Sequence, residues 1–298
     1  MFTGKSSEQV VVLGGTGKQG GEVVQELLER KKFNAAIITR NPESAKAKEL
    51  LSKGVQVIKV DLDKVTTDEL ANVFQGSYGV FSVQEMGKNE VKQGIMVADA
   101  CKKANVQHLV YSSVNAAEKA PNVPHFHSKY LIEQHIKQLN LPNFTILRPT
   151  CLMDNFDDPQ MQPKYSSLMF LIKPTTKLQW IACKDIGIAA NKAFEEPKKY
   201  AKKTVSLAGD NLTGTELAQV FSRVLGRDLK YKKMPSIILR LYSNEMYKMA
   251  DFFEKTGYDT NIPEVKKEFP QLRTMEQWLK ENEWDKKPPP KKSTCSIM

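Results

Sequence analysis

Short apolar runs alternate with amphipathic segments along the first half of the chain. Val10 to Leu13 is entirely apolar and rich in β-branched residues, which predicts a strand that is covered on both faces. Glu22 to Arg30 then places apolar residues at helical spacing. Further strands are predicted at 35–39, 55–60, 78–83, 108–112 and 144–147, and further helices at 42–53, 70–74, 89–104 and 129–139. This alternation indicates an α/β fold with a doubly wound parallel sheet.

A glycine-rich turn joins the first predicted strand to the first predicted helix. The run Gly14-Gly15-Thr16-Gly17-Lys18-Gln19-Gly20-Gly21 fits both G-x-G-x-x-G, counted from Gly15, and G-x-x-G-x-x-G, counted from Gly14. Such glycines let the backbone approach a pyrophosphate, whose charge is met by the N–H groups at the start of the helix. A nucleoside triphosphate loop is excluded, because Gln19 stands where that motif needs Ser or Thr. The sequence therefore predicts a Rossmann-type dinucleotide site.

The residue after the second predicted strand distinguishes between the two nicotinamide dinucleotides. An NAD site carries a carboxylate there, about 20 residues past the glycines, which binds the 2′-hydroxyl of the ribose. This chain has Arg40, which cannot accept that hydrogen bond but can donate charge-assisted ones to a 2′-phosphate. Lys18 and Lys59 offer further positive charge, and Asp61 follows the third strand, where the adenine amine would lie. The expected cofactor is NADP(H).

The regular alternation ends after Pro149. Helices are predicted from Asp185, from a cap at Thr213 or Thr215, and over 237–256 and 274–283, with one strand near 204–208 returning to the sheet. We therefore expect an NADP-binding Rossmann domain over residues 1–155, completed by that strand. A smaller, mostly helical and discontinuous lobe is expected over 156–285, followed by a disordered polybasic tail over 286–298.

Charge and cysteine content narrow the class of protein. The chain has 44 basic and 34 acidic residues and a net charge of +10, but the lysines form no aromatic-interleaved basic stripe. Sequence-specific binding of nucleic acid is therefore not expected. The spacing of the cysteines indicates neither a disulfide framework nor a metal site; they are Cys101, Cys151, Cys183 and Cys295. No apolar run approaches the roughly 20 residues of a membrane span and no secretory signal is recognisable, so a cytoplasmic location is expected, with the nucleus also open.

Taken together, several runs resemble the NmrA-like proteins, which are atypical short-chain dehydrogenases, and among these the NADP-sensing redox regulators. The runs are Gly14–Gly21, Thr39–Pro42, Val91–Gly94, Val110–Ser113, His125–Lys129 and Asp154–Phe156, and the likeness extends over residues 9–285. The resemblance implies a Rossmann domain with a small lobe that closes over NADP(H). It also implies a regulatory role, in which the NADPH/NADP balance sets conformation, homodimerisation and binding of a protein partner that the sequence does not identify.

The resemblance also assigns cofactor contacts by position. They fall on the glycine turn, on the segments after the second, third and fourth predicted strands, on one helix and on the segment after the sixth strand. The residues are Gly14, Gly15, Thr16, Gly17, Lys18, Gln19, Arg40, Asn41, Ser44, Asp61, Leu62, Gln84, Glu85, Met86, Lys129, Leu152, Met153, Asp154 and Asn155.

The catalytic pattern of short-chain dehydrogenases is incomplete in this chain. That pattern has a Tyr four residues before a Lys on one helix, and a Ser on the fifth strand that orients the substrate carbonyl. Lys129 is present and Ser112 or Ser113 supplies the hydroxyl, whereas His125 stands at the Tyr position. A His can shuttle protons near neutral pH, or it can serve only to cap or pack its own loop.

Two functions remain open. The first is an NADP(H) redox sensor with little or no turnover, which His125 at the Tyr position favours. The second is an NADPH-dependent oxidoreductase of a small carbonyl, quinone or aromatic substrate, with Lys129, His125 and Ser113 as its catalytic residues. Isoflavone-reductase-like relatives also lack the Tyr and rely on the Lys. The sequence alone does not decide whether the chain is an enzyme.

The run Cys295-Ser296-Ile297-Met298 matches a prenylation box whose final Met favours a farnesyl group. A polybasic segment precedes the box and supplies the second signal that stable anchoring needs; its residues are Lys286, Lys287, Lys291 and Lys292. We expect lipidation of Cys295 and peripheral association with the cytoplasmic face of a membrane. A cysteine at this position also arises by chance, and the family resemblance does not account for the tail.

Overall fold

The structure is a computed structural model that describes residues 8–287. These residues form two compact units. The first consists of the chain up to Pro149 together with Cys183–Leu207, and the second of Thr150–Ala182 together with the residues from Ala208 onward. The prenylation box at Cys295 and the rest of the predicted tail beyond residue 287 lie outside the described residues.

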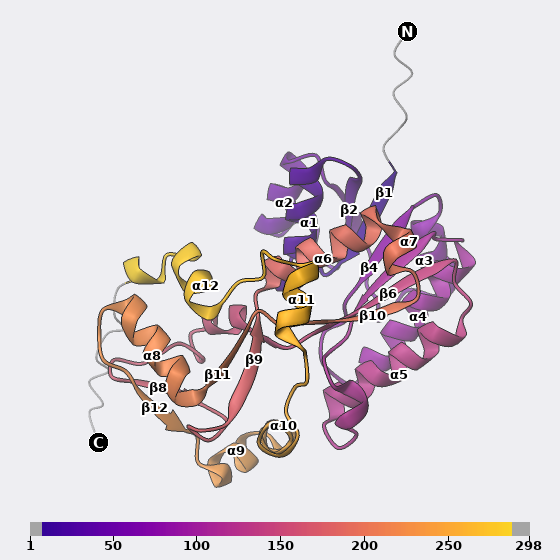
Figure 1. Cartoon of the computed structure of the whole chain (residues 1–298). Coiled ribbons are helices and arrows are strands. Elements are labelled where there is room, and N and C mark those ends of the chain that lie inside the picture. The colour runs from indigo at the N-terminus through magenta and orange to yellow at the C-terminus, as the bar shows by residue number, and fades with distance from the viewer. Residues whose placement is uncertain (1–7, 288–298) are drawn as a thin grey trace. The chain divides into compact units, whose positions relative to one another are not determined.

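The first unit is built on a parallel sheet of seven strands, in the order β10-β6-β5-β4-β1-β2-β3. The strands are β1 (Gln9–Leu13), β2 (Asn34–Thr39), β3 (Gln56–Lys59), β4 (Gly79–Ser82), β5 (His108–Ser112), β6 (Asn143–Pro149) and β10 (Lys203–Leu207). The direction in which successive strands are added reverses between β1 and β4 (Figure 1). This is the doubly wound Rossmann topology, which confirms the predicted fold class.

Helices cover both faces of this sheet. They are α1 (Lys18–Arg30), α2 (Ala45–Ser52), α3 (Thr67–Phe74), α4 (Glu90–Lys103), α5 (Pro124–Gln138), α6 (Cys183–Glu195) and α7 (Pro197–Tyr200), with a 3-10 turn at Ala117–Lys119. α1 packs against α6 on one face, and α4 lies between α3 and α5 on the other (Figure 1).

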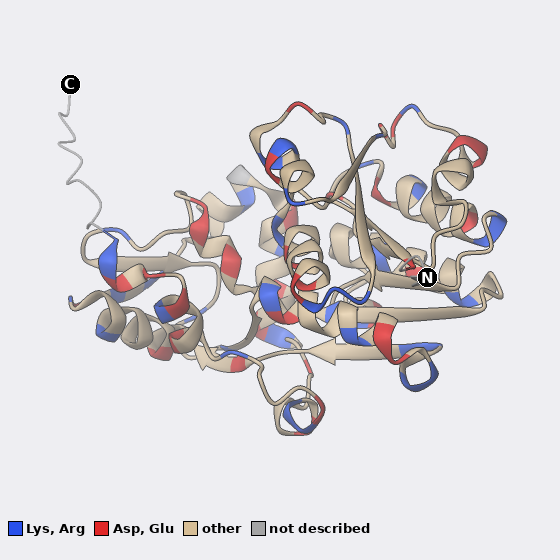
Figure 2. Ribbon diagram, turned by 90° about the horizontal axis from the view of Figure 1, so that it is seen from above, with Lys and Arg blue, Asp and Glu red and all other residues tan. Residues whose placement is uncertain are grey.

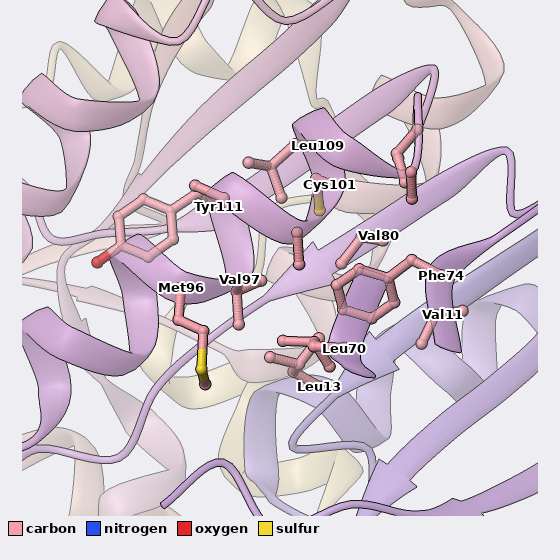
Figure 3. Packing of buried hydrophobic residues seen from close by; sticks show 14 of the residues in the cluster. Val11, Leu13, Leu70, Phe74, Val80, Met96, Val97, Cys101, Leu109 and Tyr111 are labelled. Carbon is pink, nitrogen blue, oxygen red and sulfur yellow. The ribbon is translucent and has the colours of Figure 1, made fainter. Parts of the chain in front are cut away.

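Successive residues of the central strands point to opposite faces of the sheet, and both faces are covered by helices, which explains why the predicted strands are apolar throughout. Val11 and Leu13 of β1 point toward α3 and α4, where they pack in one cluster with Phe74 (Figure 3). The intervening residues Val10 and Val12 are equally buried on the opposite face. A strand with helices on both sides needs apolar residues at both sets of positions.

Helix α6 belongs to the first unit, whereas the sequence placed it in the smaller lobe. It begins at Cys183, and Asp185, which was expected to cap it, lies buried in its first turn. A Cβ on Gly187 would lie 2.6 Å from the carbonyl oxygen of Glu22, so α6 and α1 approach closely because this residue is glycine. The sequence pattern revealed the helix but not the helix on which it packs.

Two other helices of the first unit begin at different residues from those predicted. α2 begins at Ala45 rather than Pro42, because Ser44 caps it with its side chain. α5 begins at Pro124 rather than Lys129, with the proline at its first position, where the missing N–H costs little. His125 therefore lies on the same helix as Lys129.

The second unit combines short strands with helices. Its strands form two small sheets, β11-β9-β7 and β12-β8, from β7 (Cys151–Leu152), β8 (Ser167–Phe170), β9 (Lys177–Ile181), β11 (Asp210–Thr213) and β12 (Lys230–Lys233). Its helices are α8 (Gly214–Leu225), α9 (Ser236–Tyr242), α10 (Asn244–Lys255), α11 (Ile262–Glu268) and α12 (Met275–Glu281), with 3-10 turns at Met153–Asp157 and Trp284–Lys286. Trp180 packs on Phe156 and Phe170 at ring-centroid distances of 5.4 and 5.3 Å.

Helix ends in the second unit follow from side-chain caps. Thr213, one of the two predicted caps, forms a capping box with Glu216, and Gly226 ends α8 in the left-handed conformation. The single helix predicted over 237–256 is two helices, because Ser243 has an extended backbone and caps α10. The predicted strand near 204–208 is β10 of the first unit.

Charged side chains are interspersed along the helices (Figure 2). Many form ion pairs one turn apart, such as Lys53 with Glu49 and Lys280 with Glu276. Each such exposed pair contributes little to stability. Within residues 8–287, every helix is too short or too polar to cross a membrane.

Candidate functional site

The glycine turn between β1 and α1 folds around one carbonyl group. Gly14 has a φ of +62°, a conformation that favours glycine. Its carbonyl oxygen accepts a hydrogen bond of 2.8 Å from the Gly17 N–H, and a Cβ on Gly20 would lie only 2.3 Å from it. A Cβ on Gly15 would lie 2.3 Å from Ile37 Cγ2, so the first glycine of each of the two templates is needed in this turn. α1 begins at Lys18, so the N–H groups that a helix leaves without internal partners start next to the turn.

A pocket of about 510 Å³ opens at the carboxyl ends of β1, β2, β3 and β4. This is the crevice at the reversal of strand order, where doubly wound sheets bind their ligands. The pocket brings together many predicted cofactor contacts: Gly14, Thr16, Arg40, Asn41, Ser44, Asp61, Leu62, Gln84, Glu85 and Met86. Gly15, Gly17, Lys18 and Gln19 continue along the glycine turn and the start of α1.

The segment after β2 forms one corner of the pocket. The Arg40 side chain is 68% exposed, and its guanidinium lies 3.5 Å from the carboxylate of Glu85, whose side chain is 84% exposed. Asn41 and Ser44 shape the backbone here, because Asn41 Oδ1 accepts a hydrogen bond from the Glu43 N–H and Ser44 caps α2. An exposed guanidinium close in sequence to a helix N-terminus is suited to bind a phosphate.

Asp63 ties the segment after β3 to the start of α4. Its carboxylate accepts hydrogen bonds from the side-chain amides of Gln93 and Asn89, at 2.7 and 2.8 Å. These bonds hold the pKa of the Asp63 carboxyl below its usual value. Asp61, the predicted adenine contact, accepts a hydrogen bond from the Asp63 N–H and lies 3.4 Å from Lys64 Nζ. Sequence reasoning missed Asp63 as a pocket residue, although the run of acidic residues after the strand was a signal.

Lys129 lies on the second turn of α5 and is largely buried. Its ammonium is 2.8 Å from the carboxylate of Glu90, and the two side chains are 14% and 1% exposed. Glu90 is the first residue of α4, lines the pocket, and also accepts a hydrogen bond of 2.5 Å from Ser128 Oγ. A buried carboxylate of the pocket wall thus holds Lys129. Sequence reasoning missed Glu90, whose signal was an acidic residue at the start of the helix after a buried strand.

The two serines at the end of β5 make different contacts. Ser112 Oγ donates a hydrogen bond of 2.6 Å to Gln19 at the start of α1. Ser113 Oγ donates one of 2.5 Å to buried Glu133, whose carboxylate also binds the Arg148 guanidinium at 2.8 and 2.7 Å. Ser113 is therefore engaged in a buried network, and Ser112 is the serine that contacts a predicted cofactor residue.

Two side chains are candidates for the missing proton donor. His125 is half-buried, four residues before Lys129 on α5, and its ring packs edge-to-face on Phe126 at 4.8 Å. Tyr111 on β5 is fully buried, and burial raises the pKa of its phenol well above the usual range, together with the charges of Glu90 and Glu133. Tyr111 therefore stays protonated near neutral pH, which leaves His125 as the candidate of the two, because imidazole is the side chain suited to proton transfer in that range.

The remaining predicted contacts, Leu152, Met153, Asp154 and Asn155, belong to the second unit. They span β7 and the 3-10 turn that follows it. Met153 is fully buried, and the other three are half-buried. Their contact with a cofactor stays a prediction. Within residues 8–287, His, Cys, Asp and Glu side chains form no group that could hold a metal ion.

Comparison with known proteins gives a consistent picture. The family model described as "NmrA-like family" matches residues 6–279. An NmrA-like family domain-containing protein from Dictyostelium discoideum is 31% identical over 269 residues, which cover 84% of this chain and 89% of the relative. The NmrA-like family domain-containing oxidoreductase malD from Malbranchea aurantiaca is 29% identical over 265 residues, covering 79% of this chain and 78% of the relative.

A solved structure extends the comparison to the fold. The crystal structure of NmrA, a negative transcriptional regulator, in complex with NADP has a TM-score of 0.75 and 19% identity to this chain. The match covers 93% of this chain and 95% of that one. At this level of identity, the likeness demonstrates a shared fold.

Proposed function

Because this chain belongs to the NmrA-like family, we propose that it binds NADP(H) in the pocket at the carboxyl ends of β1 to β4. The glycine turn receives the pyrophosphate next to the start of α1, and Arg40 receives the 2′-phosphate. The observation that carries the proposal is the position of Arg40, which lines the pocket after β2, where an NAD site has a carboxylate. The NADP complex of a regulator with the same fold supports it.

We propose further that occupancy of this pocket acts as a redox signal. His125 occupies the position of the usual proton donor, and Ser113 is engaged by Glu133. These features favour binding without efficient turnover. In this proposal the NADPH/NADP balance sets the conformation of the chain and its contacts with a protein partner or with a second copy of itself.

The second candidate is an NADPH-dependent oxidoreductase. Lys129 beside the pocket wall favours it, as does the likeness to malD, a relative described as an oxidoreductase. NADPH would supply the hydride, and Lys129, with His125 or a water molecule, would supply the proton to a small carbonyl, quinone or aromatic substrate. Ser112 would replace Ser113 as the hydroxyl at the site, because it contacts Gln19.

One experiment tests binding and separates the two candidates. Purified protein is titrated with NADPH and NADH, and NADPH oxidation is then followed with a panel of quinones, aldehydes and aromatic dyes. The sensor predicts a preference for NADPH with no oxidation of any substrate. Turnover that disappears in Lys129→Ala would establish the reductase instead. Equal affinity for the two dinucleotides would contradict the role of Arg40.

The cellular location and the lipidation of the tail are proposed from the sequence. We propose a cytoplasmic protein, with the nucleus open to it, that attaches to a membrane surface through farnesylated Cys295 and the neighbouring lysines. The intact mass of the protein from a eukaryotic host tests this. Loss of the last three residues with a mass gain of one farnesyl group supports the proposal, and an unmodified Cys295 rejects it.

A further inference from the structure

Glu90 joins the cofactor pocket to Lys129. The pocket wall runs without interruption from Val83 through Gln84, Glu85 and Met86 to Asn89, and Glu90 is the next residue, at the start of α4. Its side chain is almost fully buried yet lines the same pocket. A buried carboxylate needs charge compensation, and here α5 provides it.

Each oxygen of the Glu90 carboxylate has its own partner on α5. Oε1 lies 2.8 Å from Lys129 Nζ, and Oε2 accepts the hydrogen bond of 2.5 Å from Ser128 Oγ. The start of α4 adds the favourable field of a helix N-terminus. The carboxylate is therefore fixed from two sides, and it fixes the ammonium in turn.

The Lys129 ammonium keeps further donors for a ligand. An ammonium has three N–H groups, and the ion pair with a single carboxylate oxygen, Glu90 Oε1, leaves donors for neighbouring acceptors. The hydroxyls of a ribose on the nicotinamide side would accept them. Without the carboxylate, the flexible four-carbon stem of a lysine would have many orientations, and ordering it on binding would cost conformational entropy.

We infer that Glu90 is a positioning residue, whose carboxylate orients the Lys129 ammonium toward the nicotinamide ribose of bound NADP(H). This inference rests on the proposed function, because it places the cofactor in the pocket that Glu90 lines. The alternative is a purely structural clamp that joins α4 to α5 and has no effect on ligand geometry.

Two ligands distinguish positioning from clamping. NADPH carries the nicotinamide ribose, whereas adenosine 2′,5′-bisphosphate carries only the adenosine end with its 2′-phosphate. We expect Glu90→Gln to weaken NADPH binding about tenfold, because the Lys129 ammonium loses the buried charge that orients it, and to leave binding of the bisphosphate unchanged. Lys129→Ala should show the same pattern. The double variant should bind NADPH no more weakly than Lys129→Ala alone, because Glu90 acts through Lys129.

Asp99→Asn is the matched control. Asp99 also lies on α4, and its carboxylate lies 2.7 Å from Nε2 of His135 on α5, so it joins the same two helices by a different side-chain hydrogen bond. It should lower the melting temperature slightly and leave the ratio of the two affinities unchanged. If Glu90→Gln leaves the ratio of the affinities for NADPH and the bisphosphate unchanged, whatever its melting temperature, the role of Glu90 is refuted. The proposed function would still stand. Failure of the wild type to bind NADPH would overturn the proposed function and the role of Glu90 with it.

Discussion

Two ion pairs of the first unit illustrate opposite uses of charge. Arg40 and Glu85 face each other at 3.5 Å on the pocket rim, and both side chains are largely exposed. Lys129 and Glu90 lie at 2.8 Å, and both are largely buried. Water competes for the first pair and screens it, so that it contributes little to stability. The second pair has lost most of its water, and removal of one partner would leave an uncompensated charge.

This difference in burial suits the two pairs to different tasks, the selection of a ligand and the orientation of a side chain. A weak exposed pair can exchange one partner for an incoming phosphate at small cost, so Arg40 is suited to select a ligand. A buried pair keeps its geometry when a ligand arrives, so Lys129 is suited to present fixed donors. Buried polar groups elsewhere in the first unit should therefore affect stability strongly, and groups on the rim should affect mainly ligand preference.

The largest effect is expected from Glu133→Ala. Glu133 is fully buried and binds both Ser113 and Arg148, so its removal takes the bidentate partner from the Arg148 guanidinium, which keeps its ion pair with partly exposed Glu118 at 2.7 Å. We expect the free energy of unfolding to fall by about 3–5 kcal/mol, measured by urea denaturation. Lys137→Ala removes only the more exposed partner of Glu133, at 3.4 Å, and should cost less than about 1 kcal/mol. Equal losses in the two variants would refute the contrast.

A second effect concerns pH. His108 on β5 is fully buried, and burial lowers its pKa to about 4. Because the unfolded chain takes up a proton near pH 6.5 and the folded chain does not, stability is complete above that pH and is lost as the pH falls toward 4. The loss attributable to His108 is about 3 kcal/mol.

Denaturation curves at pH 7.5 and 4.5 measure this loss. His108→Gln can keep a hydrogen bond to Thr145 Oγ1, which lies 2.8 Å from His108 Nε2, but it does not titrate. Its stability should therefore change less between the two pH values than that of the wild type. Parallel changes would show that the buried imidazole contributes nothing to the acid sensitivity.

Arg40→Ala tests the rim. Loss of charge-assisted hydrogen bonds to the 2′-phosphate should weaken NADPH binding about 10- to 100-fold and leave NADH binding nearly unchanged. Calorimetric titration measures both affinities. Lys48→Ala is the control, because it removes an exposed cation of α2 that pairs with Glu43 and does not line the pocket. A comparable loss of NADPH affinity in Lys48→Ala would mean that the effect of Arg40→Ala comes from the lower net positive charge and not from contact with the 2′-phosphate.

The smallest effect is expected from Glu85→Gln. This change frees Arg40 from its carboxylate partner, so NADPH should bind a few-fold more tightly at low salt, and the gain should shrink as salt is added. Titrations at two ionic strengths measure it. Weaker binding would mean that Glu85 itself contacts the cofactor favourably.

The sequence predicted the first unit well because its signals are local. The apolar run at Val10–Leu13, the glycine turn and the alternation of strands and helices each lie within one segment, and together they define the doubly wound sheet. Arg40 was found for the same reason, since its place after β2 follows from chain order.

Contacts between distant segments escaped prediction. The role of Glu90 depends on its contact with Lys129, which lies on another helix. In the sequence, Glu90 is only an acidic residue in the first turn of a predicted helix, and such residues are common there. Helix α6 was placed in the wrong unit because a helical pattern does not name the partner on which it packs. The strands of the second unit are short; β8 and β12, for example, have four residues each, which leaves little periodic signal in the sequence.

The parallel sheet of the first unit is completed late in synthesis. Its edge strand β10 and the helix α6 that packs on α1 come from Cys183–Leu207, after the chain has passed through part of the second unit. A nascent chain ending at Pro149 would thus expose the side of α1 that α6 covers and an unpaired β6 edge. Roughly sixty further residues are therefore synthesised after Pro149 before the seven-stranded sheet is complete.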